Sequence, residues 1–143
     1  MKKGFTLIEL LGVILILGII ATIITITIDS SIKKSRLNSC LSQEKNIIEA
    51  AKTYLYVNPN ETPADGSYKA ITIANLTNKY LDSNLKNPIN DESYTNDKII
   101  VISCNKKSYK YKVCYDNQSS SCNDKEEDTC TYVTSNLTNV CNE

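Results

Sequence analysis

An uncharged apolar run near the N-terminus constrains this chain more than any other feature. The 19 residues from Leu10 to Ile28 carry no charge, and Phe5 to Ile8 extend the run on the other side of Glu9. A membrane-spanning helix needs about 20 apolar residues, so the run is long enough to cross a bilayer. We therefore predict a transmembrane helix over residues 5–28.

Charged residues at the two ends of the run predict its orientation. Lys2 and Lys3 precede it, and Asp29 ends it. Because positive residues favour the cytoplasmic side of a membrane, the N-terminus is expected inside the cell. The chain is then a single-pass protein of the cell membrane with its C-terminus outside.

Glu9 separates three interpretations of the run, which are a secretory signal, a plain anchor and a segment with a specialised use. A carboxylate inside an apolar segment is costly, and neither a signal nor a plain anchor has a use for it. A small-residue signal-cleavage site is also missing, since Ala21 is followed by Thr22 and Ile23. We therefore favour a segment with a specialised use for Glu9. The alternative is that Glu9 is a polar residue that the segment merely tolerates.

The residues around Glu9 closely resemble the N-terminal motif of type IV pilins and pseudopilins. In that family a prepilin peptidase cleaves after the glycine and methylates the new amine. The resemblance implies cleavage between Gly4 and Phe5, N-methylation of Phe5, and pairing of Glu9 with the amine of Phe5 in a neighbouring subunit. The residues that carry the resemblance are Lys3-Gly4-Phe5-Thr6-Leu7-Ile8-Glu9-Leu10-Leu11 and Val13-Ile14-Leu15-Ile16.

The same resemblance implies a set of partners and a cellular location. The expected partners are prepilin peptidase, identical or related pilin subunits in a helical filament, inner assembly platform proteins and, before assembly, membrane lipid. The filament would be extracellular or at the cell surface, and would serve adhesion, motility, secretion or DNA uptake. The alternative is a membrane-anchored binding ectodomain that never polymerises.

The helical pattern continues beyond the apolar run. Apolar residues recur with a spacing typical of an amphipathic helix over residues 29–57, until Asn58-Pro59-Asn60 ends it. Many pilins carry a helix-kinking proline near the position of Ile26, but no proline precedes Pro59, so the sequence leaves the kink open. Residues 1–4 are then a leader and 58–143 a globular head. The recurring apolar residues are Leu37, Leu41, Ile48, Ala51 and Leu55.

The head is predicted to contain a small antiparallel sheet. Ile99 to Ile102 form a β-branched run typical of a central strand, and Asn105 to Ser108 form a turn. An alternating stripe follows, which completes a hairpin and packs on the long helix or, alternatively, forms a ligand-stacking platform. Thr131 to Thr134 are expected to add a third strand, and Ile73 to Leu81 a short helix. The stripe consists of Tyr109, Tyr111, Val113 and Tyr115.

These elements together define an α+β fold of the type IV pilin kind. In it, a long N-terminal helix packs against a small antiparallel sheet. A second, looser resemblance to the connector region of pilin-like proteins from Gram-positive bacteria favours such a source. It rests on Ile71-Thr72-Ile73, Tyr80-Leu81-Asp82 and Leu85-Lys86-Asn87-Pro88.

All six cysteines lie beyond the apolar run. With no histidine and no CxxC pair, they favour disulfides in an oxidised ectodomain over free thiols or a metal site. The sequence does not select a pairing. Pilins often secure their C-terminal region with a disulfide, so the resemblance implies a disulfide-stapled C-terminal region. The candidates are Cys40, Cys104, Cys114, Cys122, Cys130 and Cys141.

Several function classes are disfavoured by what the sequence holds. It has no histidine, no Gly-rich phosphate loop and no G-x-S-x-G motif, so we expect neither an enzyme nor a cofactor. Its 16 basic and 16 acidic residues balance, and no basic cluster favours direct nucleic-acid binding. An acidic cluster is expected to be a solvated face, with calcium binding as the alternative. It consists of Asp124, Glu126, Glu127 and Asp128.

Overall fold

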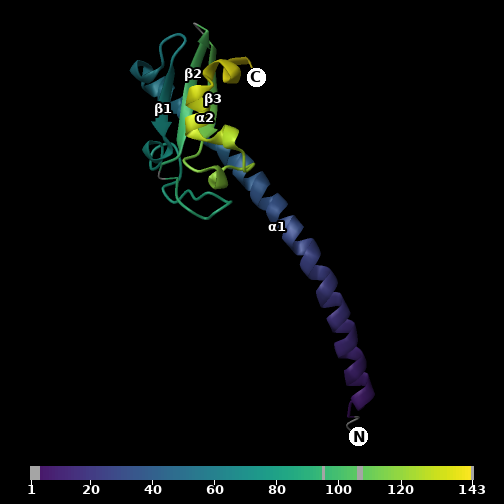
Figure 1. The fold of residues 1–143 in the computed structure, drawn as a ribbon. Helices are drawn as coiled ribbons and strands as arrows, with labels where there is room; N and C mark the ends of the chain where they lie inside the picture. Colours follow the sequence, from purple (N-terminus) through teal and green to yellow (C-terminus); the bar gives the residue numbers. More distant parts are fainter. Residues whose placement is uncertain (1–3, 95, 106–107, 143) are drawn as a thin grey trace. The chain divides into compact units, whose positions relative to one another are not determined.

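The computed structural model describes residues 4–94, 96–105 and 108–142. Backbone contacts divide the chain into two compact units, Met1–Ser35 and Arg36–Glu143. One helix, α1 (Leu7–Val57), passes through the boundary between them (Figure 1). The predicted long N-terminal helix is therefore confirmed, and the two units are described separately below.

In the first unit, the apolar side chains of α1 that the structure describes are exposed. The large apolar side chains from Phe5 to Ile23 are all exposed, for example Leu7 at 83 % and Ile20 at 46 %. An 18-residue window of this helix has a mean hydropathy of 2.9, which by length and composition suffices to cross a membrane. The backbone stays helical past position 26, although the side chain of Ile26 lies outside the described part. The helix is therefore unbroken where many pilins carry a proline.

In the second unit, α1 buries one face. Its inward residues recur every three or four positions, which is the spacing of a single helical stripe. The helix ends where the side-chain amide of Asn58 donates to the carbonyl of Tyr54 at 2.8 Å and Pro59 removes the next backbone donor. The predicted amphipathic helix and its stop signal are both confirmed. The buried or half-buried apolar residues are Leu37, Cys40, Leu41, Ile47, Ile48, Ala50, Ala51, Tyr54 and Leu55.

A three-stranded antiparallel sheet packs on this stripe. Its order is β1 (Tyr68–Thr72), β2 (Lys98–Asn105) and β3 (Ser108–Cys114). The predicted hairpin is confirmed, with Ile99 opposite Val113 and β2 in the centre. The predicted turn between them includes residues 106–107, which lie outside the described residues.

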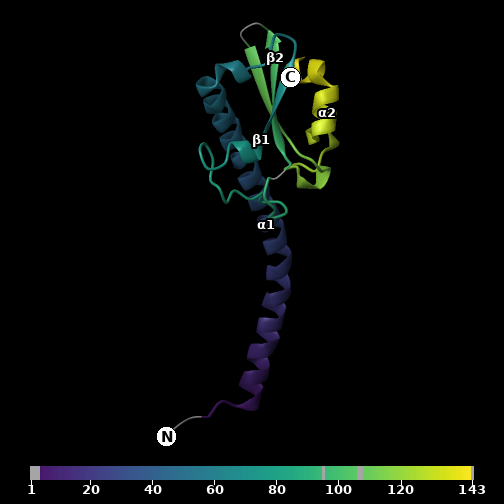
Figure 2. The ribbon, with the colours of Figure 1, turned by 90° about the vertical axis from the view of Figure 1, so that its left-hand side faces the viewer.

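Both faces of the sheet are covered. Ile99 and Val101 point into the cluster that includes the α1 stripe, whereas Ile100 and Ile102 point into a second cluster with Val133. The second cluster is closed by α2 (Cys130–Ser135) and α3 (Leu137–Asn142). Figure 2 shows α2 and the C-terminal part of α1 on opposite sides of the strands. The continuous β-branched run of β2 thus has a partner on each side.

The predicted strand over Thr131 to Thr134 is wrong, because these residues belong to α2. The hydroxyl of Thr129 accepts a hydrogen bond from the backbone N–H of Tyr132 at 3.3 Å and so caps the start of a helix. Val133 is then fully buried against the second face of the sheet. The need to cover that face overrides the local β-propensity of the segment.

The third strand is β1 instead, and the predicted helix over Ile73 to Leu81 is also wrong. Only Ile73–Asn75 are helical, as a single 3-10 turn. Asn78 has a φ of 68°, which ends any helix, and Thr77 bridges to Leu81. Leu76 is nevertheless buried, and Tyr80 packs on the core.

The predicted tyrosine stripe packs mainly on α1. Lys52 of α1 lies 5.7 Å from the ring centre of Tyr111, and the hydroxyl of Tyr115 donates to Glu44 of α1 at 2.7 Å. Tyr109 remains 37 % exposed. The packing role is confirmed for Tyr111 and Tyr115.

All six cysteines are paired, which confirms the predicted disulfide staples. One bridge joins α1 to the loop after β3, another joins β3 to the start of α2, and the third joins β2 to α3. Each therefore ties the C-terminal region to a different part of the second unit. The pairs are Cys40–Cys122, Cys114–Cys130 and Cys104–Cys141.

Candidate functional site

The predicted cleavage position lies just before the first turn of α1. Gly4, Phe5 and Thr6 are not helical, and α1 begins at Leu7. The side chain of Phe5 is 88 % exposed. The peptide bond between Gly4 and Phe5 is thus outside the helix, in backbone that no hydrogen-bond ladder encloses.

Thr6 and Glu9 form a reciprocal cap at the start of the helix. The carboxylate oxygen Oε2 of Glu9 accepts from the backbone N–H of Thr6 at 2.9 Å and from its hydroxyl at 2.8 Å. The hydroxyl of Thr6 in turn accepts from the backbone N–H of Glu9 at 3.3 Å. This is a capping box, in which two residues three positions apart satisfy donors that a helix start leaves unpaired.

Glu9 therefore has a role within its own chain. Both hydrogen bonds to its carboxylate reach the same oxygen, Oε2. Within the part of the chain that the structure describes, the second oxygen accepts no hydrogen bond. That oxygen is available to a donor from outside the chain.

Sequence reasoning missed the part played by Thr6. The signal was present, because a threonine followed three positions later by a glutamate, just ahead of an apolar run, is the pattern of a capping box. The sequence-based interpretation of Glu9 is a contact with another subunit or, alternatively, a merely tolerated polar residue, and neither includes the cap. Of the predicted site residues, Gly4, Phe5 and Glu9 lie within one short segment, and the six cysteines all lie in the second unit.

The exposed apolar part of α1 includes a surface of small and branched residues. It is formed by Ile14, Leu15, Gly18, Ile19 and Thr22. A Cβ added at Gly18 would meet nothing within 4 Å, so its small size serves no contact among the described residues. Small residues on a membrane helix let a second helix approach closely.

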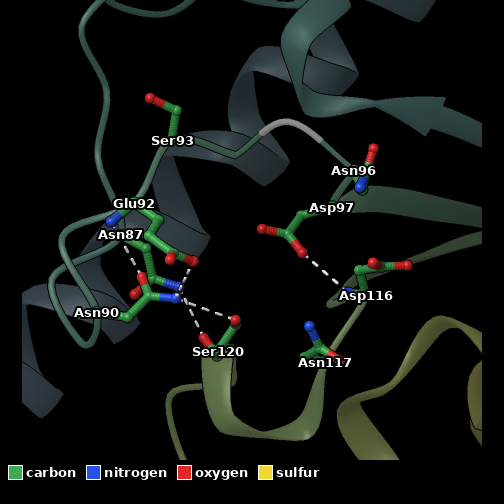
Figure 3. Close-up of a pocket in the computed structure, with 9 residues that line it drawn as sticks. All are labelled: Asn87, Asn90, Glu92, Ser93, Asn96, Asp97, Asp116, Asn117 and Ser120. Carbon is green, nitrogen blue, oxygen red and sulfur yellow. Dashed lines mark hydrogen bonds between the residues drawn. The ribbon is translucent and has the colours of Figure 1, made fainter.

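A separate polar cavity of about 250 Å³ lies in the second unit (Figure 3). Asp97 is nearly buried there, and its Oδ1 accepts the backbone N–H of Asp116 at 2.9 Å. Burial raises the pKa of the Asp97 carboxyl, and the nearby charges of Asp116 and Glu92 add to that rise. The lining residues are Asn87, Asn90, Glu92, Ser93, Asn96, Asp97, Asp116, Asn117 and Ser120.

Hydrogen bonds across this cavity join two loops. The side-chain amide of Asn87 donates to the carbonyl of Ser120 at 2.7 Å and accepts from the N–H of Ile89 at 2.9 Å. Asn90 also reaches the hydroxyl of Ser120, at 3.1 Å. These contacts hold the loop before β2 against the loop after β3, and among the described residues no group of three or more metal-binding side chains accompanies them.

Comparison with known proteins adds one match. Residues 1–25 match the family model of the prokaryotic N-terminal methylation motif. No curated protein and no solved structure matches the chain.

The matched motif and the fold agree with each other. The motif covers the cap and the exposed apolar helix, and behind it the same helix carries a small antiparallel sheet with a disulfide-stapled C-terminal region. In its N-terminal methylation motif and in this arrangement of helix, sheet and disulfides, the chain is similar to type IV pilins and pseudopilins.

Proposed function

We propose that this protein is a structural subunit of a type IV pilus or a related pseudopilus. Prepilin peptidase removes residues 1–4 and methylates the amine of Phe5, and the subunit then waits in the membrane with its head outside the cell. Assembly platform proteins extract it into a filament held together by N-terminal helices. The observation that carries the proposal is the match of residues 1–25 to the methylation motif.

The exposed apolar part of α1 supports a role in cohesion. Its large apolar side chains from Phe5 to Ile23 are exposed, and water is an unfavourable environment for so much apolar surface. Lipid before assembly, and neighbouring helices afterwards, would cover it. Residues 5–28 then form the filament core, residues 29–57 connect to the head, and residues 58–143 form the head.

Glu9 supports a role in setting the stagger between subunits. Cleavage creates an α-amine at Phe5, and the free oxygen of Glu9 offers an acceptor to the amine of a neighbour. Such a pair inside an apolar bundle acts mainly by fixing register, because a mismatched stagger leaves a charge unpaired. The cap by Thr6 would hold the carboxylate ready for that contact.

The decisive measurement is the mass of the mature N-terminus, made on chain purified from its native host. We expect a chain that begins at Phe5 and carries one methyl group on its amine. A chain that keeps Met1 would instead indicate a plain membrane anchor with a binding ectodomain. A cut beyond Ala21 would indicate an ordinary secretory signal, and either result would overturn the proposal.

A pair of variants then tests assembly separately from processing. Glu9→Gln keeps the shape of the side chain and removes its charge, and should abolish or strongly reduce filaments while the head stays folded. Asp29→Asn makes the same chemical change at the other end of the apolar run and should leave filaments intact. Electron microscopy of sheared filaments, with immunoblots of membrane-bound subunit, distinguishes lost assembly from lost protein.

A further inference from the structure

The Cys40–Cys122 bridge lies where α1 enters the second unit. Cys40 is five residues beyond Ser35, the last residue of the first unit, and it is the first residue of α1 that the structure describes as buried. Its partner Cys122 belongs to the loop after β3. A disulfide within the C-terminal region would secure that region alone, whereas this bridge connects it to the helix that carries the head.

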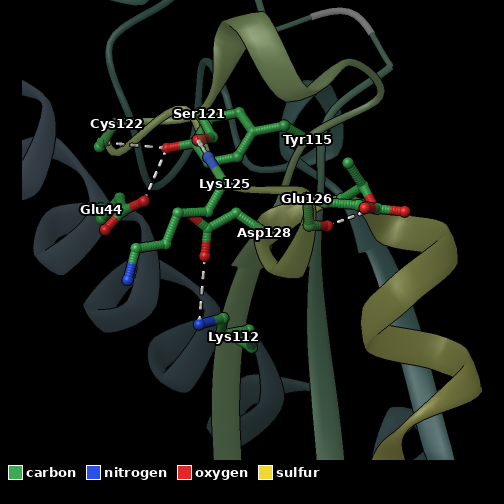
Figure 4. A network of polar contacts seen from close by, with 9 residues as sticks. Glu44, Lys112, Tyr115, Ser121, Cys122, Lys125, Glu126 and Asp128 are labelled. Atoms are coloured by element: carbon green, nitrogen blue, oxygen red, sulfur yellow. Dashed lines mark hydrogen bonds and ion pairs between the residues drawn. The ribbon is translucent and has the colours of Figure 1, made fainter.

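The bridge is enclosed by the groups around it. Cys40 has no exposed surface, and Cys122 is 6 % exposed. The hydroxyl of Tyr115 lies 3.3 Å from the sulfur of Cys122 and donates to Glu44 of α1 at 2.7 Å (Figure 4). Because reduction requires a thiolate to reach one of the two sulfur atoms, this enclosure protects the bridge from reductants in solution.

The loop that carries Cys122 is also fixed to β3 and the residues that follow it. The backbone N–H of Tyr115 donates to the carbonyl of Asp128 at 2.9 Å, and the Asp128 carboxylate lies 3.3 Å from the amine of Lys112. Asp128 is therefore buried, whereas the other acids of its cluster are exposed, so the predicted solvated face does not include Asp128. These contacts hold the loop, and with it Cys122, beside α1.

The bridges decide which parts of the chain carry tension that is applied between α1 and the C-terminus. One covalent route crosses from Cys40 to Cys122 and follows the chain to Cys141. The other follows the chain from Cys40 to Cys104 and crosses to Cys141. Between Cys40 and Cys141 the first route runs along 19 residues of chain and the second along 64. The shorter route becomes taut first, so it takes the load.

We propose that the Cys40–Cys122 bridge is a tension lock, by which we mean that it keeps residues 41–103 out of the load path when the chain is pulled along α1. Those residues include the rest of α1, the whole of β1 and most of β2. Only the source of the load, which is tension along a filament, rests on the proposed function.

The lock protects the packing of α1 on the sheet. The hydrogen bonds of a helix run along its axis, so an axial load on α1 beyond Cys40 would stretch them and peel the helix from the strands. Ile47 and Leu55, which are buried on the sheet side of α1, would then be exposed. With the bridge formed, the load leaves α1 at Cys40, before it reaches either residue.

Single-molecule pulling on the full-length chain in detergent micelles tests the lock. Handles are attached at the two ends of the chain, and the greatest extension is measured with the disulfides formed. C40S/C122S should extend further than the wild type by the 45 residues that separate the two routes, or about 150 Å at 3.3–3.6 Å per residue. Covalent connections set this limit, so the result does not depend on whether the variant is folded.

Two matched controls each lose a different bridge. C104S/C141S and C114S/C130S leave the route through Cys122 intact, so both should reach the same greatest extension as the wild type. A general loss of stability lowers the force at which the head unfolds but does not change this limit. The greatest extension therefore distinguishes the lock from the stabilisation that any disulfide provides.

Three results would overturn the proposal. C40S/C122S could extend no further than the wild type, either control could extend as far as C40S/C122S, or the wild-type chain could extend as far as the fully reduced chain. None of these measurements depends on N-terminal processing or on filaments. Failure of the lock is therefore distinguishable from failure of the proposed function.

Discussion

The two parts of α1 place similar apolar side chains in opposite environments. Before the unit boundary at Ser35, the described large apolar residues are exposed, and Ile16 is 60 % exposed. After it, Ile47 is completely buried against the sheet. The backbone is the same continuous helix throughout, so helix formation alone explains neither arrangement.

The difference shows that the two parts use apolar surface for different purposes. The second part follows the rule of a soluble protein, with one buried stripe and one polar face. The first part is apolar on all sides, which is the composition of a helix covered by lipid or by other helices. Each part therefore predicts a different result when the same kind of residue is changed.

The largest expected effect comes from removing the bridge between α1 and the C-terminal loop. Replacing Cys40 and Cys122 together by serine frees a loop with a sequence separation of 82 and should lower the free energy of unfolding of the second unit by about 2–5 kcal/mol. The same double change at Cys104 and Cys141, which are 37 residues apart, should cost somewhat less. Urea unfolding, monitored by tyrosine fluorescence, measures the free energy of unfolding of both double variants. If C40S/C122S were as stable as the wild type, the role given to this bridge would be contradicted.

An effect of comparable size is expected from one side-chain truncation in each part of the helix. Ile47→Ala leaves a cavity in the core and should lower the free energy of unfolding of the second unit by about 2–5 kcal/mol. Ile16→Ala removes the same atoms from an exposed position and should not change it. If Ile47→Ala and Ile16→Ala unfolded at the same urea concentration, the claimed difference between the two parts of the helix would be contradicted.

The cap at the start of α1 should contribute less again. Thr6→Ala removes the hydroxyl that bonds to Glu9 and should weaken the first turn by about 1 kcal/mol. Amide hydrogen exchange at Leu7 to Leu10 measures the fraying, and Thr6→Ser is the matched control that keeps the hydroxyl. Equal exchange rates in Thr6→Ala and Thr6→Ser would show that the hydroxyl does not hold the turn.

The smallest effect is a pH dependence confined to the second part. Burial raises the folded-state pKa of Glu44 above its ordinary value of 4.5, so ionising it opposes folding. The stability of the wild-type chain should therefore fall as the pH rises from 4.5 through the raised pKa, and then level off. Glu44→Gln should lack this decline, and parallel pH profiles of the two proteins would contradict the assignment.

The features that could be predicted from sequence are those encoded by local patterns. The apolar run, the stripe from Leu37 to Leu55 and the alternation around Tyr111 each specify an element by periodicity alone. The motif around Glu9 likewise lies within a few consecutive residues. These patterns need no knowledge of which segments meet in space.

The features that could not be predicted depend on contacts between distant residues. Thr131 to Thr134 have the composition of a strand and form a helix because the far face of the sheet needs cover. Asp128 belongs to a run of acidic residues that predicts a solvated face. It is buried only because the fold places it beside Lys112 and α1. The cysteine pairing likewise depends on distances that a sequence does not contain.

The three disulfides have a consequence for a chain that is cut. Their spans overlap, from Cys40 to Cys122, from Cys104 to Cys141 and from Cys114 to Cys130. Any single broken peptide bond between Cys40 and Cys141 therefore leaves two fragments that are still covalently joined. A protease that nicks one surface loop would not release the head from its helix.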